Sequence, residues 1–254
     1  MIVLRSLAFN VLFSAWTLVA FLVGLPALVS TQATHVGARL WVRGILALLA
    51  VTVGIRHRCV GLDNRPAGPA IYAFKHQSAW DTLVPVLVLE RPAITLKQEL
   101  LRLPLFGWYL SRSGAIPIDR TAGAKSLRRM IQAAKKAAAA GQPLVIYPEG
   151  TRVAPGQRLP YRPGVAALYR ALDLPVVPVA HNAGLFWGRR AFLKRPGVIT
   201  LEFLPPIAPG LDRDAFMRRL EESMETAANR LINDVSSSAS NRSRTNIDPA
   251  RPGS

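Results

Sequence analysis

The sequence is poor in cysteine and in acidic residues. Cys59 is its only cysteine among 254 residues, so no intrachain disulfide can form and an oxidising compartment is not indicated. We expect Cys59 to be a small apolar filler rather than a reactive thiol. Only 15 Asp and Glu stand against 32 Lys and Arg, which gives a formal net charge of +17. Such a basic chain attracts phosphates, whether they belong to nucleic acid, lipid headgroups or a small substrate.

Several functional signatures are also missing. The sequence contains no aromatic RNP run, no zinc-finger spacing and no basic helix joined to heptads, so we predict no nucleic-acid partner. It contains no G-x-S-x-G segment, which argues against a serine hydrolase. Of the four histidines, His35, His57 and His181 lack a carboxylate at useful spacing. They form no metal-ligand pattern with His76, and we predict no metal site.

Charge is absent from a long N-terminal stretch. No charged residue occurs from Ser6 to Thr34, half of all residues are hydrophobic and the mean hydropathy is positive. At about 1.5 Å per residue, the apolar run from Leu7 to Val29 is long enough to cross or enter a bilayer, so we predict a membrane segment. A cleaved signal peptide is the alternative, but the apolar stretch exceeds the usual length and no clear A-x-A site follows it.

A second apolar stretch covers residues 44–55. It is too short to span a bilayer comfortably, and Arg39, Arg43, Arg56 and Arg58 flank it. Such a helix is expected to lie at the membrane interface with its arginines reaching the headgroups, so the two segments predict an anchoring hairpin. A buried core helix is the alternative for this second segment. Whether the first helix crosses the membrane stays open, and the arginines beyond it favour a cytoplasmic catalytic domain.

Beyond Cys59, short apolar runs alternate with longer helical patterns. Strands are expected at residues 69–74, 114–118, 143–147, 176–180 and 198–204. Helices are expected at residues 122–140, 163–172 and 212–235. This alternation predicts an α/β fold with a mixed β-sheet covered by helices, preceded by the two-helix membrane-anchoring hairpin. The expected parts are an anchor over residues 1–60, a catalytic domain over 61–235 and a disordered basic tail over 236–254.

A histidine and an aspartate stand five residues apart after the first predicted strand of the catalytic domain. Ser78 suits a helix N-cap, and the spacing from Ser78 to Asp81 fits a capping box. His76, in the loop ahead of this turn, can therefore fold back onto Asp81. A carboxylate on one ring nitrogen fixes the tautomer and makes the other nitrogen a base for an alcohol proton. The alternative is that Asp81 only caps the helix and His76 is an ordinary loop histidine.

A second polar segment follows the strand expected at residues 143–147. It consists of Glu149, Gly150, Thr151 and Arg152. Gly150 lets the backbone approach a ligand, Arg152 can bind a phosphate bidentately, and Glu149 can accept a hydrogen bond from a substrate hydroxyl. The alternative is a surface Glu–Arg pair in a turn.

These segments resemble signature motifs of the glycerolipid acyltransferases, most closely those of bacterial 1-acyl-sn-glycerol-3-phosphate acyltransferases. The H-x4-D of residues 75–81 looks like the first motif, and the Glu-Gly-Thr-Arg of residues 149–152 looks like the third. Similarity to the second and fourth motifs is found at residues 96–100, 104–107, 114–120 and 176–180. Lys75 stands where the family often has Asn, which puts in doubt any contact that the family makes through that Asn.

The resemblance implies an O-acyltransferase that moves a fatty acyl chain from acyl-CoA or acyl carrier protein to the free sn-2 hydroxyl of 1-acyl-sn-glycerol 3-phosphate, giving phosphatidic acid. The donor is a substrate, and no permanently bound cofactor is implied. The implied location is the bacterial inner (cytoplasmic) membrane, with the catalytic domain facing the cytoplasm and an anionic membrane surface as partner. One alternative acceptor is another lysolipid, such as a lyso-ornithine lipid or a lysophospholipid. The other alternative is a non-enzymatic protein that binds anionic lipid or nucleic acid.

The resemblance also implies roles for single residues. His76 is the general base, and Asp81 is its orienting partner. The substrate-binding set comprises Lys97, Arg120, Glu149, Gly150, Thr151 and Arg152. Its three cations hold the acceptor phosphate, and its glutamate orders the glycerol part. For Arg120, a structural pair with Asp119 is the alternative.

Overall fold

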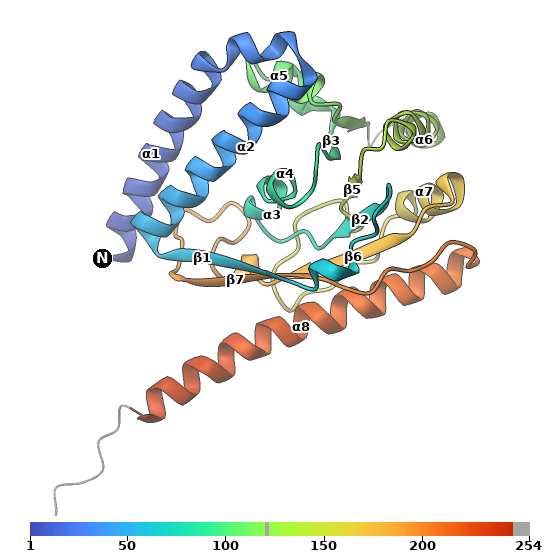
Figure 1. Ribbon diagram of the computed structural model, residues 1–254. Coiled ribbons are helices and arrows are strands. Elements are labelled where there is room, and N and C mark those ends of the chain that lie inside the picture. The colour runs from blue at the N-terminus through green and yellow to red at the C-terminus, as the bar shows by residue number, and fades with distance from the viewer. Residues whose placement is uncertain (120–121, 246–254) are drawn as a thin grey trace, which may run out of the picture.

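The computed structural model describes residues 1–119 and 122–245, with side chains described as far as residue 237. Within these residues seven strands form one sheet in the order β1-β7-β6-β2-β5-β3-β4 (Figure 1). The strands are β1 (Ile55–Val60), β2 (Ile71–Phe74), β3 (Ala93–Lys97), β4 (Ile116–Ile118), β5 (Leu144–Ile146), β6 (Val176–His181) and β7 (Gly197–Phe203). Neighbouring strands are parallel except β6 and β7, which are antiparallel. The predicted mixed sheet is confirmed.

Helices cover both faces of this sheet (Figure 1). They are α1 (Ile2–Val23), α2 (Thr31–Leu48), α3 (Trp80–Leu83), α4 (Pro85–Val88), α5 (Phe106–Arg112), α6 (Gly123–Ala139), α7 (Gly164–Leu172) and α8 (Arg213–Thr245). One hydrophobic core joins the sheet to α1, α2, α3 and α4, and a second joins it to α6, α7 and α8. The helices predicted at residues 122–140 and 163–172 are confirmed to within one residue at each end.

The central strand β2 shows why two cores form. Tyr72 and Phe74 belong to the core beneath the N-terminal hairpin, whereas Ile71 and Ala73 belong to the core beneath α6, α7 and α8. Successive side chains of a strand point to opposite faces, and all four are buried here. Burial on both faces is typical of a central parallel strand. Because β2 ends at Phe74, the next residue lies at the edge of the sheet where the strand ends.

Two strands are absent from the sequence-based prediction. β1 lies at an edge of the sheet and exposes Arg56, His57 and Arg58, so its composition does not indicate a buried strand. β3 has five residues and ends in the exposed Lys97. Both strands are defined by their non-local partners, which are β7 for β1 and the pair β4 and β5 for β3. Short-range patterning carries no information about those partners.

The N-terminal hairpin of two apolar helices is confirmed, but its second helix is longer than predicted. α2 continues through a π-helical segment, η2 (Leu49–Val53), so one helical stretch covers Thr31–Val53 rather than residues 44–55. A charged residue that interrupts the apolar pattern is used for packing, because Arg39 donates hydrogen bonds to two backbone oxygens of the α4 segment. By length and composition alone, each helix of the hairpin could cross a bilayer.

The second helix has a buried face and an exposed apolar face. Val42 and Ile45 are fully buried in the core, as expected of a core helix. Val36 and Leu40 are 52% and 56% exposed, which leaves an apolar face without cover in the described structure. The core-helix alternative therefore holds for one face of α2, and the membrane contact of the other face stays a prediction.

The last helix runs past its predicted end. α8 begins after Asp212, whose carboxylate accepts hydrogen bonds from the backbone N–H groups of Asp214 and Ala215, and it ends at Thr245 rather than at Val235. A helix that is nucleated and packed over its first turns extends at little cost even through a serine-rich stretch. The boundary expected at Val235 is therefore wrong by ten residues. The rest of the predicted tail, residues 246–254, lies outside the described residues.

Candidate active site

Most of the polar side chains singled out in the sequence lie at one edge of the sheet. β6, β2, β5, β3 and β4 run parallel, so their carboxyl ends meet at the edge where ligands bind in open α/β sheets. His76 follows β2, residues 149–152 follow β5, Lys97 ends β3 and His181 ends β6. Arg120, which follows β4 in the chain, lies outside the described residues.

His76 and Asp81 form the predicted pair. Nδ1 of His76 lies 2.8 Å from Oδ1 of Asp81. The other carboxylate oxygen, Oδ2, accepts hydrogen bonds from the backbone N–H groups of Gln77 and Ser78 at 2.7 and 2.6 Å. The Ser78 hydroxyl in turn accepts from the N–H of Trp80 at 3.1 Å. The predicted N-cap at Ser78 is wrong by one residue, because α3 begins after Ala79 and has no side-chain cap hydrogen bond. Asp81 therefore binds the backbone of the turn ahead of α3 and orients the histidine at the same time.

The electrostatics of the pair favour an ionised aspartate and a basic Nε2. Burial opposes ionisation of Asp81, but His76 and the N–H of Gln77 outweigh it and hold the pKa of the carboxyl below its usual value. An ionised Asp81 accepts a hydrogen bond from Nδ1–H of His76, which leaves the lone pair of Nε2 free to act as a base. The His76 side chain is 13% exposed whereas that of Asp81 is fully buried, so the histidine is the member that a substrate reaches.

Sequence reasoning missed His181. Its Nε2 lies 2.7 Å from the backbone oxygen of Lys75 and 3.5 Å from Oδ2 of Asp81, and its Nδ1 accepts from the N–H of Ala183. Burial lowers the pKa of His181, so the ring is neutral and donates through Nε2. His181 has no carboxylate at useful spacing in the sequence, but the parallel pairing of β2 with β6 brings it to Asp81, which is 100 positions away. Its place at the end of the fourth-motif strand was the available signal.

Tyr147 is a second residue that sequence reasoning missed. Its ring centroid lies 4.4 Å from that of His76, and its hydroxyl donates to the backbone oxygen of Asp81 at 3.0 Å. Burial raises the pKa of Tyr147 well above its ordinary value, so the hydroxyl remains a donor. Because the N–H of Val153 also donates to the backbone oxygen of His76 at 2.8 Å, the loop after β5 holds the histidine loop on two sides.

Glu149 lies beneath the histidine loop. It is 1% exposed, and its Oε1 lies 3.0 Å from Nζ of Lys75 and accepts a hydrogen bond from the backbone N–H of His76 at 3.4 Å. Burial raises the pKa of Glu149, and the ammonium of Lys75 opposes that shift. This position differs from the expected contact with a substrate hydroxyl, because the side chain is used inside the protein. Its Oε2 is buried and has no hydrogen-bond partner among the described residues.

Arg152 combines a half-buried position with an unused donor. Its Nε is buried and, within the described part of the chain, has no acceptor. A buried guanidinium N–H without a partner suits an anionic ligand, because such a donor is costly to leave unpaired. Gly150 and Thr151 are half-buried in the same turn. Gly150 has a left-handed φ of 66°, and an added Cβ would lie 3.1 Å from Cγ of Arg162, so the turn favours glycine.

Lys97 lies at the predicted edge but has a partner. Its side chain is 50% exposed, and Nζ lies 2.9 Å from Oε1 of Glu99, which is also exposed. Exposed ion pairs of this kind contribute little to stability and exchange readily. Lys97 is therefore a surface cation that can change partner. It lies two strands from His76, because β5 separates β3 from β2 in the sheet.

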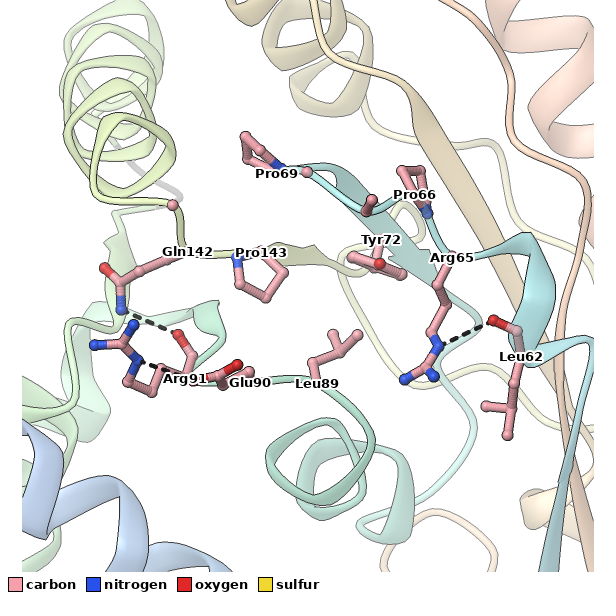
Figure 2. Close-up of a pocket in the computed structure, with 13 residues that line it drawn as sticks. Leu62, Arg65, Pro66, Pro69, Tyr72, Leu89, Glu90, Arg91, Gln142 and Pro143 are labelled. Carbon is pink, nitrogen blue, oxygen red and sulfur yellow. Dashed lines mark hydrogen bonds and ion pairs between the residues drawn. The ribbon is translucent and has the colours of Figure 1, made fainter.

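A cavity of about 430 Å³ lies at the opposite edge of the sheet (Figure 2). It is lined by residues that precede β2, β3 and β5, and Figure 2 shows Arg91 and Gln142 on one side of it and Arg65 on the other. It shares no residue with the histidine pair. Among the residues that the structure describes, no group of three or more His, Cys, Asp or Glu side chains is arranged to hold a metal ion.

The fold and the residues at this edge define an acyltransferase. Residues 56–182 match the family model described as Acyltransferase, which is half of the chain, and the protein belongs to this family.

Similar proteins are named as acyltransferases of 1-acyl-sn-glycerol 3-phosphate. The chain is 34% identical over 206 residues to the 1-acyl-sn-glycerol-3-phosphate acyltransferase of Pseudomonas aeruginosa, covering 80% of each protein. It is 28% identical over 163 residues to that of Escherichia coli, covering 63% of this chain and 65% of the other. The crystal structure of the 1-acyl-sn-glycerophosphate (LPA) acyltransferase PlsC from Thermotoga maritima matches with a TM-score of 0.76 at 19% identity, over 91% of this chain and 98% of that one.

Proposed function

We propose that the protein is a 1-acyl-sn-glycerol-3-phosphate acyltransferase, which transfers a fatty acyl chain from a thioester to the free sn-2 hydroxyl of lysophosphatidic acid and forms phosphatidic acid. The observation that carries the proposal is the His76–Asp81 pair at the same edge of the sheet as Arg152, whose buried Nε has no acceptor among the described residues. A base and an anion-binding group in one place fit an acceptor that has both a hydroxyl and a phosphate.

The proposed reaction is a direct transfer. Nε2 of His76 takes the proton of the sn-2 hydroxyl as its oxygen attacks the thioester carbonyl, and Asp81 stabilises the imidazolium that forms. The tetrahedral intermediate then collapses, the ester C–O bond remains, the C–S bond breaks, and the leaving thiolate takes the proton from His76. The base is thereby regenerated, and no group of the protein is acylated. Both acyl-CoA and acyl carrier protein supply such a thioester, and no permanently bound cofactor takes part.

The acceptor phosphate is proposed to bind to the cations at the edge of the sheet. Arg152 is the principal contact, and Lys97 contributes when it leaves Glu99. Arg120 keeps its proposed role because it follows β4, which is the neighbour of β3 at the same edge. Glu149 is proposed to act from beneath the histidine loop rather than on the glycerol part of the substrate.

We further propose that the hairpin lies in the membrane interface and does not cross it. Both ends of α1 are attached to the catalytic domain, since Ser6 binds the backbone of Lys194 and the backbone oxygen of Phe21 accepts from the Tyr109 hydroxyl. In Figure 1 the hairpin accordingly runs along the body of the protein rather than away from it. The exposed face of α1 includes large apolar side chains at Val3, Leu4, Leu7, Val11, Leu12, Leu18, Val19, Leu22 and Val23. This arrangement would place the active site at the surface of the bacterial inner membrane, on its cytoplasmic side.

A panel of acceptors tests the proposed substrate. Purified protein is assayed with acyl-CoA and lysophosphatidic acid, an uncharged monoacylglycerol, a lysophospholipid and a lyso-ornithine lipid. We expect transfer to lysophosphatidic acid to be preferred, and Arg152→Ala to raise its KM by about 10- to 100-fold, as for loss of a hydrogen bond to a charged group. Arg170→Ala, which removes an exposed arginine of α7, is the control and should match the wild type. Equal activity on the uncharged acceptor, or preference for another lysolipid, would contradict the assignment.

A further inference from the structure

A buried lysine lies between two carboxylates directly beneath the active site. Lys75 is 1% exposed, and its Nζ lies 2.6 Å from Oε1 of Glu225 and 3.0 Å from Oε1 of Glu149. The Tyr161 hydroxyl donates to the same oxygen of Glu225 at 2.9 Å. One ammonium therefore binds the loop after β5, through Glu149, to the helix α8, through Glu225.

The backbone of the same lysine belongs to the active-site loop. Its carbonyl oxygen accepts from Nε2 of His181, and its N–H donates to the backbone oxygen of Val179 on β6. The next N–H in the chain is that of His76, and it donates to the Glu149 oxygen that Lys75 holds. Lys75 thus connects four segments, β2, β6, the loop after β5 and α8, at the residue that precedes the proposed base.

Stability alone does not explain this buried cluster of one ammonium and two carboxylates. Removing three ionisable groups from water costs more than their attraction returns unless the geometry is held closely, and apolar replacements of equal volume are often as stable. The alternative hypothesis for this site is that the buried ion pairs fix a defined geometry. An Asn in place of Lys75 would leave Glu149 and Glu225 without a cation between them.

We propose that Lys75 is a positioning residue for acyl transfer and that Glu225 on α8 is its required counter-charge. The ammonium fixes the Glu149 carboxylate, the carboxylate fixes the N–H of His76, and the imidazole is thereby held over the acceptor. The inference rests on the proposed function, because it assumes that His76 is the base. It adds α8, which follows the four motifs in the chain, to the parts of the protein on which the reaction depends.

Two variants test the pairing by rescue. Lys75→Asn leaves two carboxylates facing each other, and we expect kcat to fall on the order of 100-fold, as for misplacement of a catalytic group by about an ångström. The KM for lysophosphatidic acid should stay within about threefold, because the substrate contacts remain. Glu225→Gln added to Lys75→Asn removes one of the facing charges and supplies amide N–H donors to Glu149 in place of the ammonium, so kcat should recover to within about tenfold of the wild type because the two sites are coupled.

The chain offers a matched control for loss of an ion pair to α8. Nε of Arg158 lies 2.7 Å from Oε1 of Glu221, one helical turn before Glu225, but Arg158 is 62% exposed. Arg158→Asn and Glu221→Gln, singly and together, should leave kcat within about threefold of the wild type, as expected for an exposed pair. A loss of kcat in this control equal to that of Lys75→Asn would mean that any contact to α8 has the effect, and would contradict the proposal.

The outcomes separate this inference from the proposed function. A folded wild type that transfers no acyl group to any lysolipid removes the proposed function, whatever the variants do. An active wild type with an equally active Lys75→Asn, or a double variant no better than Lys75→Asn, overturns the positioning role. Should Lys75→Asn fail to fold by circular dichroism, Glu225→Gln is expected to restore both fold and turnover, and a double variant that stays unfolded contradicts the pairing.

Discussion

At the scale of single residues, the active site depends on how both oxygens of one buried carboxylate are used. Asp81 binds His76 through Oδ1 and the turn ahead of α3 through Oδ2, with His181 close to the second oxygen. A protonated acid could not accept all of these hydrogen bonds, so the ionised form is the one that holds the loop together. The proposed catalytic role and the local stability are therefore linked through the same side chain.

This linkage predicts a loss of stability in acid. Burial lowers the pKa of His181 below its ordinary value of 6.5, and the pKa of Asp81 is also lowered, so in both cases the unfolded chain binds protons more readily than the folded one. The stability that His181 contributes is complete above its unfolded pKa and is lost as the pH falls below it; that of Asp81 is lost at lower pH still. We expect the thermal midpoint to fall by a few degrees from about pH 7 to about pH 5.

The control for this prediction removes the titrating group. His181→Gln cannot take up a proton, so its thermal midpoint should decline less over the same interval, measured by differential scanning fluorimetry. A wild type whose midpoint is constant from pH 7 to 5, or a variant with an unchanged slope, would show that His181 is not the group responsible.

The residues that could be predicted from the sequence are those whose partners are near in the chain. The His76–Asp81 contact follows from a spacing of five residues and a helix that begins between them, and the structure confirms that contact. The environment of Glu149 could not be predicted, because Lys75 lies more than 70 positions away and meets it only through the pairing of β2 with β5. Residue types indicate which groups carry charge. Only the sheet shows which charged groups, such as Glu149, are paired with another side chain inside the protein.

At the scale of elements, one loop fastens the hairpin beside the active site. The 186–196 loop precedes β7, and its Lys194 donates from Nζ to Oδ1 of Asn10 on α1 at 2.7 Å. Its Arg189 donates to the backbone oxygen of Arg152 at 3.4 Å. Phe192 and Leu193 are 49% and 41% exposed in this loop, which also carries exposed arginines. We expect it to enter the membrane interface together with α1, since apolar tips among basic residues suit anionic lipid.

Replacing the two apolar tips tests this role. Phe192→Ser with Leu193→Ser should weaken binding to vesicles containing anionic phosphatidylglycerol roughly tenfold in a flotation assay, from the apolar area that no longer leaves water. Leu159→Ser with Leu211→Ser is the matched control, because these leucines are 41% and 39% exposed and lie outside the loop and the hairpin. Equal loss in both double variants, or no loss in the first, would count against a membrane role for the loop.

Elements were predictable where their pattern is local. α6 and α7 follow from apolar periodicity bounded by Gly and Pro, and the strands at the centre of the sheet follow from short apolar runs. β1 could not be predicted because its residues are basic and exposed. The sequence predicts too short an α2, because a charged residue such as Arg39 indicates the end of an apolar helix, whereas here it lies within the helix and binds the α4 segment. In each case a contact with another part of the chain decides the outcome, and the local sequence does not contain it.

At the scale of the whole molecule, the sheet order brings the chemistry together. His76, the proposed base, follows the central strand β2, the residues of the third motif follow its neighbour β5, and Lys97 ends β3 beyond them. The hairpin and α8 lie on opposite faces of the sheet (Figure 1). The class of fold was predictable from alternating strands and helices, whereas the order of strands depends on non-local parallel pairing, which periodicity does not encode.

The most direct test of the account is the single-turnover rate of acyl transfer from acyl-CoA to lysophosphatidic acid by His76→Ala. If His76 is the general base, we expect the rate to fall about 1,000-fold while the affinity for lysophosphatidic acid changes less than about threefold, because general base catalysis contributes roughly 100- to 10,000-fold. Circular dichroism of the variant verifies that it is folded. A folded His76→Ala protein that transfers the acyl group at the wild-type rate would contradict the central claim.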